Sequence, residues 1–410
     1  MRFYLLKGLS MSLKQSFNTN VLLLLLAQGI SGAALSLLTF CSALASKWLL
    51  DDSLDSITPS HHSVTLHSLI NLDTLSISAT LCGSFLAILF SSKLMLRFGR
   101  KKVFLWACVL GMLGALLGMY ALELRSFYLF ILATFLLGFF TATNQFYRFL
   151  AQEALKTTHQ AHRATAFIVG GGILGGILGP NLANAGVYLS DTLFLGSFFF
   201  ALLLCFVNFL LTLPLKLNPI KQSLSSKTSF KEYLKEKDFI FATLACAFGF
   251  ALMTLVMNAA PLAMKGYNFS NTDSKNVLVW HFIAMYAPSF FLGFSKNLNP
   301  KRLIFLGMAL YFVAAVIGIV SQDFLGFWLS LVLVGIAWCF SFNGGTFLLN
   351  AISSPYKLKL QELNALATFL ANFIASLSVG GILASGGYIV LNIVVLVAAF
   401  VFFMLIFKYK

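Results

Sequence analysis

The feature that most constrains this chain is an uninterrupted run of 45 residues without a charge, 363–407. A helix needs about 20 apolar residues to cross a membrane, so this run is long enough for two spans. The chain is expected to reverse at Ser385, Gly386 and Gly387, because glycine tolerates the positive φ of a tight turn. A second uncharged run, 21–46, has 26 residues and indicates another span of the same kind.

The composition excludes most classes of soluble protein. Hydrophobic residues make up 59% of the 410 positions and charged residues only 10%, whereas soluble domains carry about 25% charged residues. We therefore expect an all-α polytopic membrane protein and neither a soluble enzyme nor a nucleic-acid-binding domain. Twelve membrane-spanning helices are expected, near residues 20–47, 70–92, 103–122, 127–150, 164–190, 192–214, 239–264, 276–296, 303–322, 324–352, 362–385 and 388–407.

The net charge of +15 is distributed unevenly over the loops. If both termini are cytoplasmic, 24 of the 28 Lys and Arg residues fall on the inner side, whereas eight of the thirteen acidic residues fall on the outer side. This is the positive-inside bias of membrane proteins. The bias accounts for the basic charge without a nucleic-acid partner and predicts that both termini are cytoplasmic.

The longest inner loop divides the chain into two halves. We expect an N-terminal six-helix bundle over 1–213, a cytoplasmic linker over 214–237 and a C-terminal six-helix bundle over 238–410. Short basic loops, 93–102 and 296–302, follow the second span of each half. Such a parallel repeat is typical of transporters whose two bundles rock about a central site.

The loop after the second span carries a family motif. Residues 92–102 read SKLMLRFGRKK and resemble the G-x-x-x-D-R-x-G-R-K-x motif of the major facilitator superfamily. The matching positions are Arg97, Gly99, Arg100 and Lys101. Two positions differ, because Ser92 stands where the family has glycine and Leu96 where it has aspartate. Glu153, in the loop after the fourth span, is expected either to pair with Arg97 or Arg100 as a latch or to be a solvated glutamate.

Further stretches extend the resemblance over the whole chain. Gly175, Gly179 and Pro180 form a G-x-x-x-G-P sequence similar to the fifth-span motif of antiporters in this superfamily, and we expect a bend there. Residues 146–149, 257–264 and 280–290 look like those of a bacterial branch of its permeases. The resemblance implies a monomeric, multi-pass protein of the bacterial inner membrane that binds a small molecule and needs no cofactor.

Polar residues in four spans are candidates for the substrate cavity. In this superfamily spans 1, 4, 7 and 10 line the central cavity, and polar side chains inside a bilayer usually face protein or water. The cavity candidates are Gln28, Thr141, Gln145, Arg148, Asn258 and Asn343. For these residues the alternative is a role in helix packing. For Arg148 the alternative is snorkelling to lipid phosphate at the inner rim.

Titratable groups that could couple transport to protons are few. Asp73, in the first turn of the second span, and His281, in the eighth, are the coupling candidates, together with Glu153. A neutral, hydrogen-bonded imidazole is the alternative for His281. The outer loop after the first span contains three histidines and three aspartates, but their spacing matches no closed metal site, and we expect none.

The sequence leaves three functions open. The first is a secondary transporter of a small organic solute that works by alternating access, with proton-coupled antiport or efflux as one mode. The second is an uptake permease or facilitator for a metabolite. The third is a membrane-embedded enzyme acting on lipid-linked substrates, which the lack of clustered acids or histidines at a membrane face disfavours, so we expect a protein that is not an enzyme.

Overall fold

The structure is a computed structural model that describes residues 18–54, 75–151, 158–187, 189–217, 233, 236–295 and 298–409. Helices make up most of these residues, and no strand occurs among them. Within the same ranges, eleven helices are long and apolar enough to cross a membrane. The predicted all-α, multi-pass membrane architecture is confirmed.

The chain folds as two compact units. The N-terminal unit contains the described residues of Leu22–Tyr147 and Leu174–Lys221. The C-terminal unit contains the described residues of Arg148–Ile173 and Gln222–Lys410, together with 18–21. The segment Arg148–Ile173 therefore comes from the first half of the sequence but packs with the second half.

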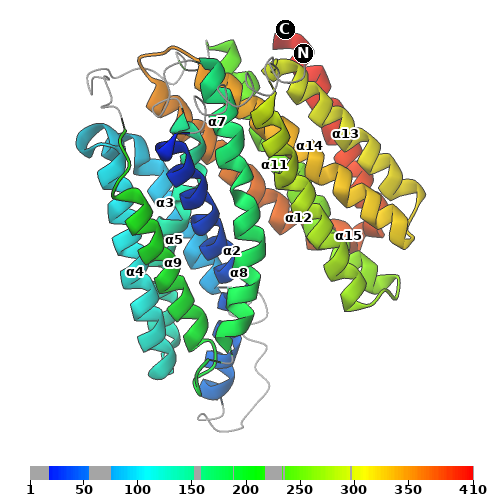
Figure 1. Cartoon of the computed structure of the whole chain (residues 1–410). Helices are drawn as coiled ribbons and strands as arrows, with labels where there is room; N and C mark the ends of the chain where they lie inside the picture. The colour runs from blue at the N-terminus through cyan, green and yellow to red at the C-terminus, as the bar shows by residue number, and fades with distance from the viewer. Residues whose placement is uncertain are drawn as a thin grey trace, which may run out of the picture. The chain divides into compact units, whose positions relative to one another are not determined.

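The helices of the N-terminal unit are drawn in blue to green in Figure 1. They are α2 (Thr19–Leu54), α3 (Leu75–Phe98), α4 (Arg100–Glu123), α5 (Phe127–Thr141), the short 3-10 helix η3 (Ala142–Gln145), α8 (Gly172–Val187) and α9 (Leu195–Thr212). The helix α5 packs against α3 and α4, and α4 also packs against α9. Glycines allow the closest approach, since a Cβ atom at Gly83 of α3 would lie 2.1 Å from the carbonyl oxygen of Phe135.

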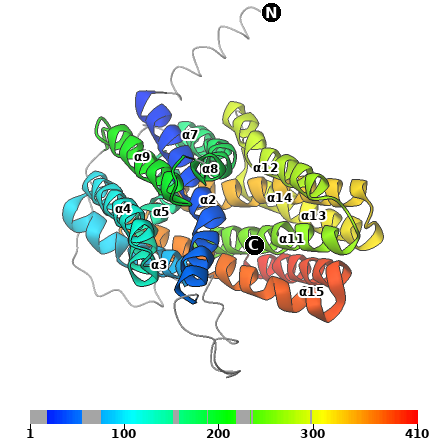
Figure 2. The ribbon, with the colours of Figure 1, turned by 90° about the horizontal axis from the view of Figure 1, so that it is seen from below.

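The C-terminal unit contains the remaining helices. They are η4 (Tyr147–Phe149), α7 (Thr158–Gly170), α11 (Lys237–Gly266), α12 (Asn271–Phe294), α13 (Pro300–Val320), α14 (Phe324–Ala351) and α15 (Lys357–Tyr409). The boundary between the two units falls within η4, between Tyr147 and Arg148. The helix α11 packs against α14 and α15, and α12 packs against α7 and α14. Figure 2 gives a second view of these helices, with α11 beside α15 and α14 beside α13.

The last helix, α15, is two helices joined at a kink. The backbone leaves the helical conformation at Gly386 and Gly387, and Gly387 has φ 69° and ψ −160°. A residue with a Cβ atom rarely adopts such a φ. The uncharged run of 45 residues is therefore interrupted at the glycines from which the reversal was predicted.

The fifth span is also interrupted, but at a position that its motif does not indicate. Helix α7 ends at Gly170 and α8 begins at Gly172, and the N–H of Gly171 reaches the carbonyl oxygens of both Phe167 and Ile168. Helix α8 then continues through Pro180. The interruption at Gly171 thus lies nine residues before the proline at which we expected a bend.

Candidate functional site

Arg148 is buried in the C-terminal unit with only 1% of its surface exposed. Its Nη1 atom donates to Thr346 Oγ1 at 2.7 Å and to Cys246 Sγ at 3.5 Å. Its Nη2 atom donates to Asn364 Oδ1 at 2.8 Å. The guanidinium thus binds α11, α14 and α15 at once. This geometry differs from snorkelling, in which the charged group would leave the protein interior.

Two aromatic rings also lie against this cation. The guanidinium carbon of Arg148 lies 4.4 Å from the ring centroid of Phe149 and 4.1 Å from that of Phe342. An aromatic face attracts a cation, and the attraction is stronger where water is excluded. Amide, hydroxyl and ring groups therefore contact a permanent charge inside the unit.

Asn350, near the end of α14, ties the same segment to two further helices. Its Nδ2 atom donates to the carbonyl oxygen of Arg148 at 3.1 Å and to Thr165 Oγ1 of α7 at 3.4 Å. Its carbonyl oxygen accepts a 2.6 Å hydrogen bond from Lys357 Nζ, at the start of α15. Asn350 continues the polar spacing of Asn343 and Thr346 along α14.

Helix α7 lies closely against α12 within this unit. Arg163 Nε donates to the carbonyl oxygen of Gly293 at 2.7 Å. A Cβ atom at Gly293 of α12 would lie 2.7 Å from the ring of Phe167 of α7, and one at Gly172, the first residue of α8, would lie 2.3 Å from the ring of Tyr286 of α12. The glycines therefore let aromatic rings reach the backbone of a neighbouring helix.

Three cavity candidates lie in the N-terminal unit. The carbonyl oxygen of Gln28, on α2, accepts from Asn144 Nδ2 at 3.1 Å. Thr141 Oγ1 donates to the carbonyl oxygen of Gly138 at 3.0 Å and lies 2.9 Å from Ser84 Oγ. Gln145 ends the short helix η3. These bonds hold neighbouring helices together: that of Gln28 joins α2 to η3, and that of Thr141 with Ser84 joins α5 to α3.

The loop motif lies where α3 meets α4. Gly99 has φ 85°, a conformation that favours glycine, and it separates the two helices. Arg97 is exposed at the end of α3, with its guanidinium carbon 5.1 Å from the ring centroid of Phe98. Arg100 is buried at the start of α4, and Lys101 follows half-buried. Their expected partner, Glu153, lies outside the described residues.

The glycine motif of the fifth span packs against α2 in the N-terminal unit. A Cβ atom at Gly175 would lie 2.8 Å from the carbonyl carbon of Gly32, and one at Gly179 would lie 2.6 Å from the carbonyl oxygen of Ala33. Pro180 follows inside α8. These positions therefore need glycine for a close contact between helices.

Four aromatic rings meet near the middle of the spans in the C-terminal unit. Trp338 and Phe342, one turn apart on α14, are nearly parallel, with centroids 4.9 Å apart and an interplanar angle of 15°. Phe250 of α11 and Tyr286 of α12 each meet Trp338 edge to face, at 5.3 and 5.4 Å. Trp338 and Phe342 are buried, whereas Phe250 and Tyr286 are half-buried.

Polar side chains join α11 to α15 along their length. Asn364 Nδ2 donates to Thr243 Oγ1 at 3.2 Å, Thr254 Oγ1 donates to Asn372 Oδ1, and Asn258 Nδ2 donates to Ser376 Oγ at 3.2 Å. The candidate Asn258 thus belongs to a polar seam, defined by these three pairs. The other C-terminal candidate, Asn343, is buried and donates to Ser289 Oγ and to the carbonyl oxygen of Cys339, both at 2.8 Å.

Of the coupling candidates, the structure describes His281. It is fully buried, and its Nδ1 atom lies 2.7 Å from the carbonyl oxygen of Leu331, to which it must donate. Its Nε2 atom has no partner among the described residues. The arrangement suits a neutral imidazole that joins α12 to α14. Asp73, Glu153 and the outer loop with its histidines and aspartates lie outside the described residues.

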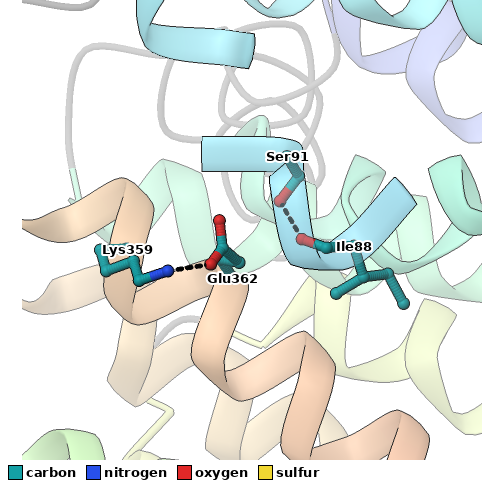
Figure 3. Close-up of polar contacts among 4 residues, drawn as sticks. All are labelled: Ile88, Ser91, Lys359 and Glu362. Carbon is teal, nitrogen blue, oxygen red and sulfur yellow. Dashed lines mark hydrogen bonds and ion pairs between the residues drawn. The ribbon is translucent and has the colours of Figure 1, made fainter. Parts of the chain in front are cut away.

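Glu362 is a buried acid that the sequence did not single out. It lies in the second turn of α15 with 1% of its surface exposed, and it forms an ion pair with Lys359 of the same helix. Figure 3 draws this pair, and it also draws the separate bond from Ser91 Oγ to the carbonyl oxygen of Ile88 in α3. The position of Glu362, directly before the long uncharged run, was the available signal.

Comparisons of sequence and structure agree with this architecture. Residues 8–349 match the sequence model of a family described as the Major Facilitator Superfamily. A relative from Brucella anthropi, the riboflavin transporter RfnT, is 31% identical over 331 residues, which are 78% of this chain and 82% of that protein.

Solved structures of the same fold are more distant in sequence. The Escherichia coli fucose:proton symporter FucP superposes with a TM-score of 0.72 at 14% identity, covering 95% of this chain and 98% of that chain. The human organic anion transporter MFSD10 gives a TM-score of 0.70 at 15% identity, covering 96% of this chain and 99% of that chain.

Proposed function

This chain belongs to the Major Facilitator Superfamily and is a secondary transporter of a small solute, not an enzyme, and we propose that its solute is riboflavin or a close flavin relative. The observation that carries the proposal is the 31% identity to a riboflavin transporter over 82% of that protein. The four aromatic rings near mid-depth support it, since stacking against aromatic side chains is a common way to bind a planar heterocycle.

We infer that transport proceeds by alternating access and that Arg148 belongs to the gate. If the expected bundles 1–213 and 238–410 move as bodies, the contacts of Arg148–Ile173 with α12, α14 and α15 must break in each cycle. A guanidinium suits such a contact, because its planar group can bond to Thr346 of α14 and Asn364 of α15 at the same time.

The finer architecture is also part of the proposal. We propose twelve spans, both termini in the cytoplasm, a linker over 214–237 and a monomer in a bacterial inner membrane. The kink at Gly386 and Gly387 supports a twelfth span, and the Lys and Arg distribution supports the topology. Reporter fusions after Lys237 and after Asp55 should give inside and outside signals respectively, and the opposite pattern would overturn the topology.

Transport of riboflavin is tested with the purified protein in liposomes. Riboflavin uptake should saturate and exceed the uptake by protein-free liposomes, and unlabelled riboflavin should compete whereas fucose should not. Imposed proton gradients of either sign then separate antiport, symport and facilitated diffusion, since only a coupled carrier changes its rate with the gradient. Riboflavin flux equal to that of protein-free liposomes would overturn the proposed substrate.

A further inference from the structure

The aromatic rings Phe250, Tyr286 and Trp338 lie at similar depth on three spans. Phe250 is the fourteenth residue of α11, which has 30 residues, and Trp338 is the fifteenth of α14, which has 28. At 1.5 Å per residue, each lies about 20 Å from the start of its helix, near the centre of a bilayer. A solute bound at these rings would be far from both membrane surfaces.

The buried indole of Trp338 carries a donor that is not used. Its surface is only 2% exposed, and its Nε1 atom has no hydrogen-bond partner among the described residues. An unsatisfied N–H group in a dry interior destabilises the protein, so an acceptor supplied by a ligand would be bound favourably. Phe250 and Tyr286 are the more exposed rings of this group, so a ligand would meet them first.

One residue of the polar seam, Thr254, lies one turn away on the same face of α11. Phe250 and Thr254 are four residues apart, so their side chains lie on one face and about 6 Å apart along the helix. Thr254 is bonded to Asn372 of α15. One turn before Asn372, Thr368 Oγ1 is buried and has no partner among the described residues. An aromatic surface and hydroxyl-binding groups are therefore adjacent.

We propose that the C-terminal unit binds the two parts of a flavin at two neighbouring places. The planar ring stacks against Phe250 and Tyr286 and accepts a hydrogen bond from Trp338 Nε1 through a ring carbonyl oxygen. The hydroxylated chain bonds to Thr254 and Asn372. This assignment rests on the proposed function. It requires no charged side chain, which is consistent with a solute that is itself uncharged.

The test compares two variants of the full-length protein with two ligands. Trp338→Phe keeps an aromatic ring but removes the N–H, and Thr254→Val keeps the shape but removes the hydroxyl. Riboflavin has both the ring and the chain, whereas lumichrome has the ring alone. Trp280→Phe is the matched control, because Trp280 is 50% exposed on α12 and contacts Trp328 instead.

Binding is measured by quenching of the ligand's own fluorescence, with melting curves to verify folding. Trp338→Phe should lower the affinity for riboflavin and for lumichrome about tenfold, the loss expected for one buried hydrogen bond. Thr254→Val should lower the affinity for riboflavin about fivefold and leave the affinity for lumichrome unchanged. Trp280→Phe should bind both ligands as the wild type does. If the wild type binds riboflavin and both variants match it, the two-part site is wrong and the proposed function stands. If the wild type binds no riboflavin, the proposed function fails and this inference fails with it.

Discussion

Arg148 Nη1 donates a 2.7 Å hydrogen bond to Thr346 Oγ1, although the two residues are 198 positions apart in the chain. The other terminal nitrogen of the same guanidinium donates to Asn364, which is 216 positions away. Arg148 thus joins a segment of the first half of the sequence to α14 and α15. Because Arg148 is buried, a guanidinium that moved away from these partners would be left without hydrogen bonds to protein or to water.

Substitution of Arg148 should distinguish a bidentate contact from simple charge attraction. Arg148→Lys keeps the charge but cannot reproduce two bonds in a fixed plane, so the transport rate should fall at least about tenfold. Arg148→Ala should lose transport while the protein still reaches the membrane. The rates are measured as riboflavin uptake into liposomes at matched protein content.

Arg302→Lys serves as the control, because Arg302 is exposed in the first turn of α13 and lies outside the loop motif. It should keep a rate within about twofold of the wild type, since surface charge contacts contribute little. Wild-type flux in Arg148→Lys would remove Arg148 from the gate.

The contact between α2 and α8 should depend on Gly179. A Cβ atom there would lie 2.5 Å from the Cβ of Ser36 and 2.6 Å from the carbonyl oxygen of Ala33, so Gly179→Ala forces the helices apart. We expect a loss of about 1–3 kcal/mol in stability, seen as a lower melting temperature of the purified protein. Gly380→Ala, where a Cβ atom would meet nothing within 4 Å, should show no loss. Equal melting temperatures for the two variants would mean that the glycine motif is not needed for packing.

His281 should act as a structural residue and not as the coupling group. His281→Asn keeps a side-chain N–H for the carbonyl oxygen of Leu331 but cannot titrate. The pH profile of riboflavin transport should therefore match that of the wild type. His281→Ala should lower the melting temperature, since the buried carbonyl loses its side-chain donor. A flattened pH profile in His281→Asn would instead make His281 a proton carrier.

The sequence predicted the architecture well because membrane spans are local features. Each span depends on the charge and polarity of its own residues, so the helical class follows from short windows. The glycines at 386 and 387 likewise marked the kink in α15, because their conformational freedom is a local property. The interruption at Gly171 was less readable, since Pro180 gave the stronger local signal and α8 continues through it.

The contacts of the candidate site could not be read in the same way. Arg148 was a cavity candidate with snorkelling as the alternative. Its partners Thr346 and Asn364 are remote in the chain, and one sequence gives no pairing over such separations. The polar seam was partly readable, because Asn364, Thr368, Asn372 and Ser376 recur every four residues. Asn258 of α11 was a cavity candidate, but nothing local indicated that it would bond to Ser376 of α15.

Counterflow of riboflavin tests the central claim most directly. Liposomes containing the purified protein are loaded with excess unlabelled riboflavin and diluted into a trace of labelled riboflavin, without any ion gradient. A carrier that alternates between two open states should accumulate the label transiently above its equilibrium level, because exchange is faster than net efflux. The account predicts this overshoot in the wild type and its loss in Arg148→Ala. A monotonic rise to equilibrium, or no uptake above protein-free liposomes, would contradict it.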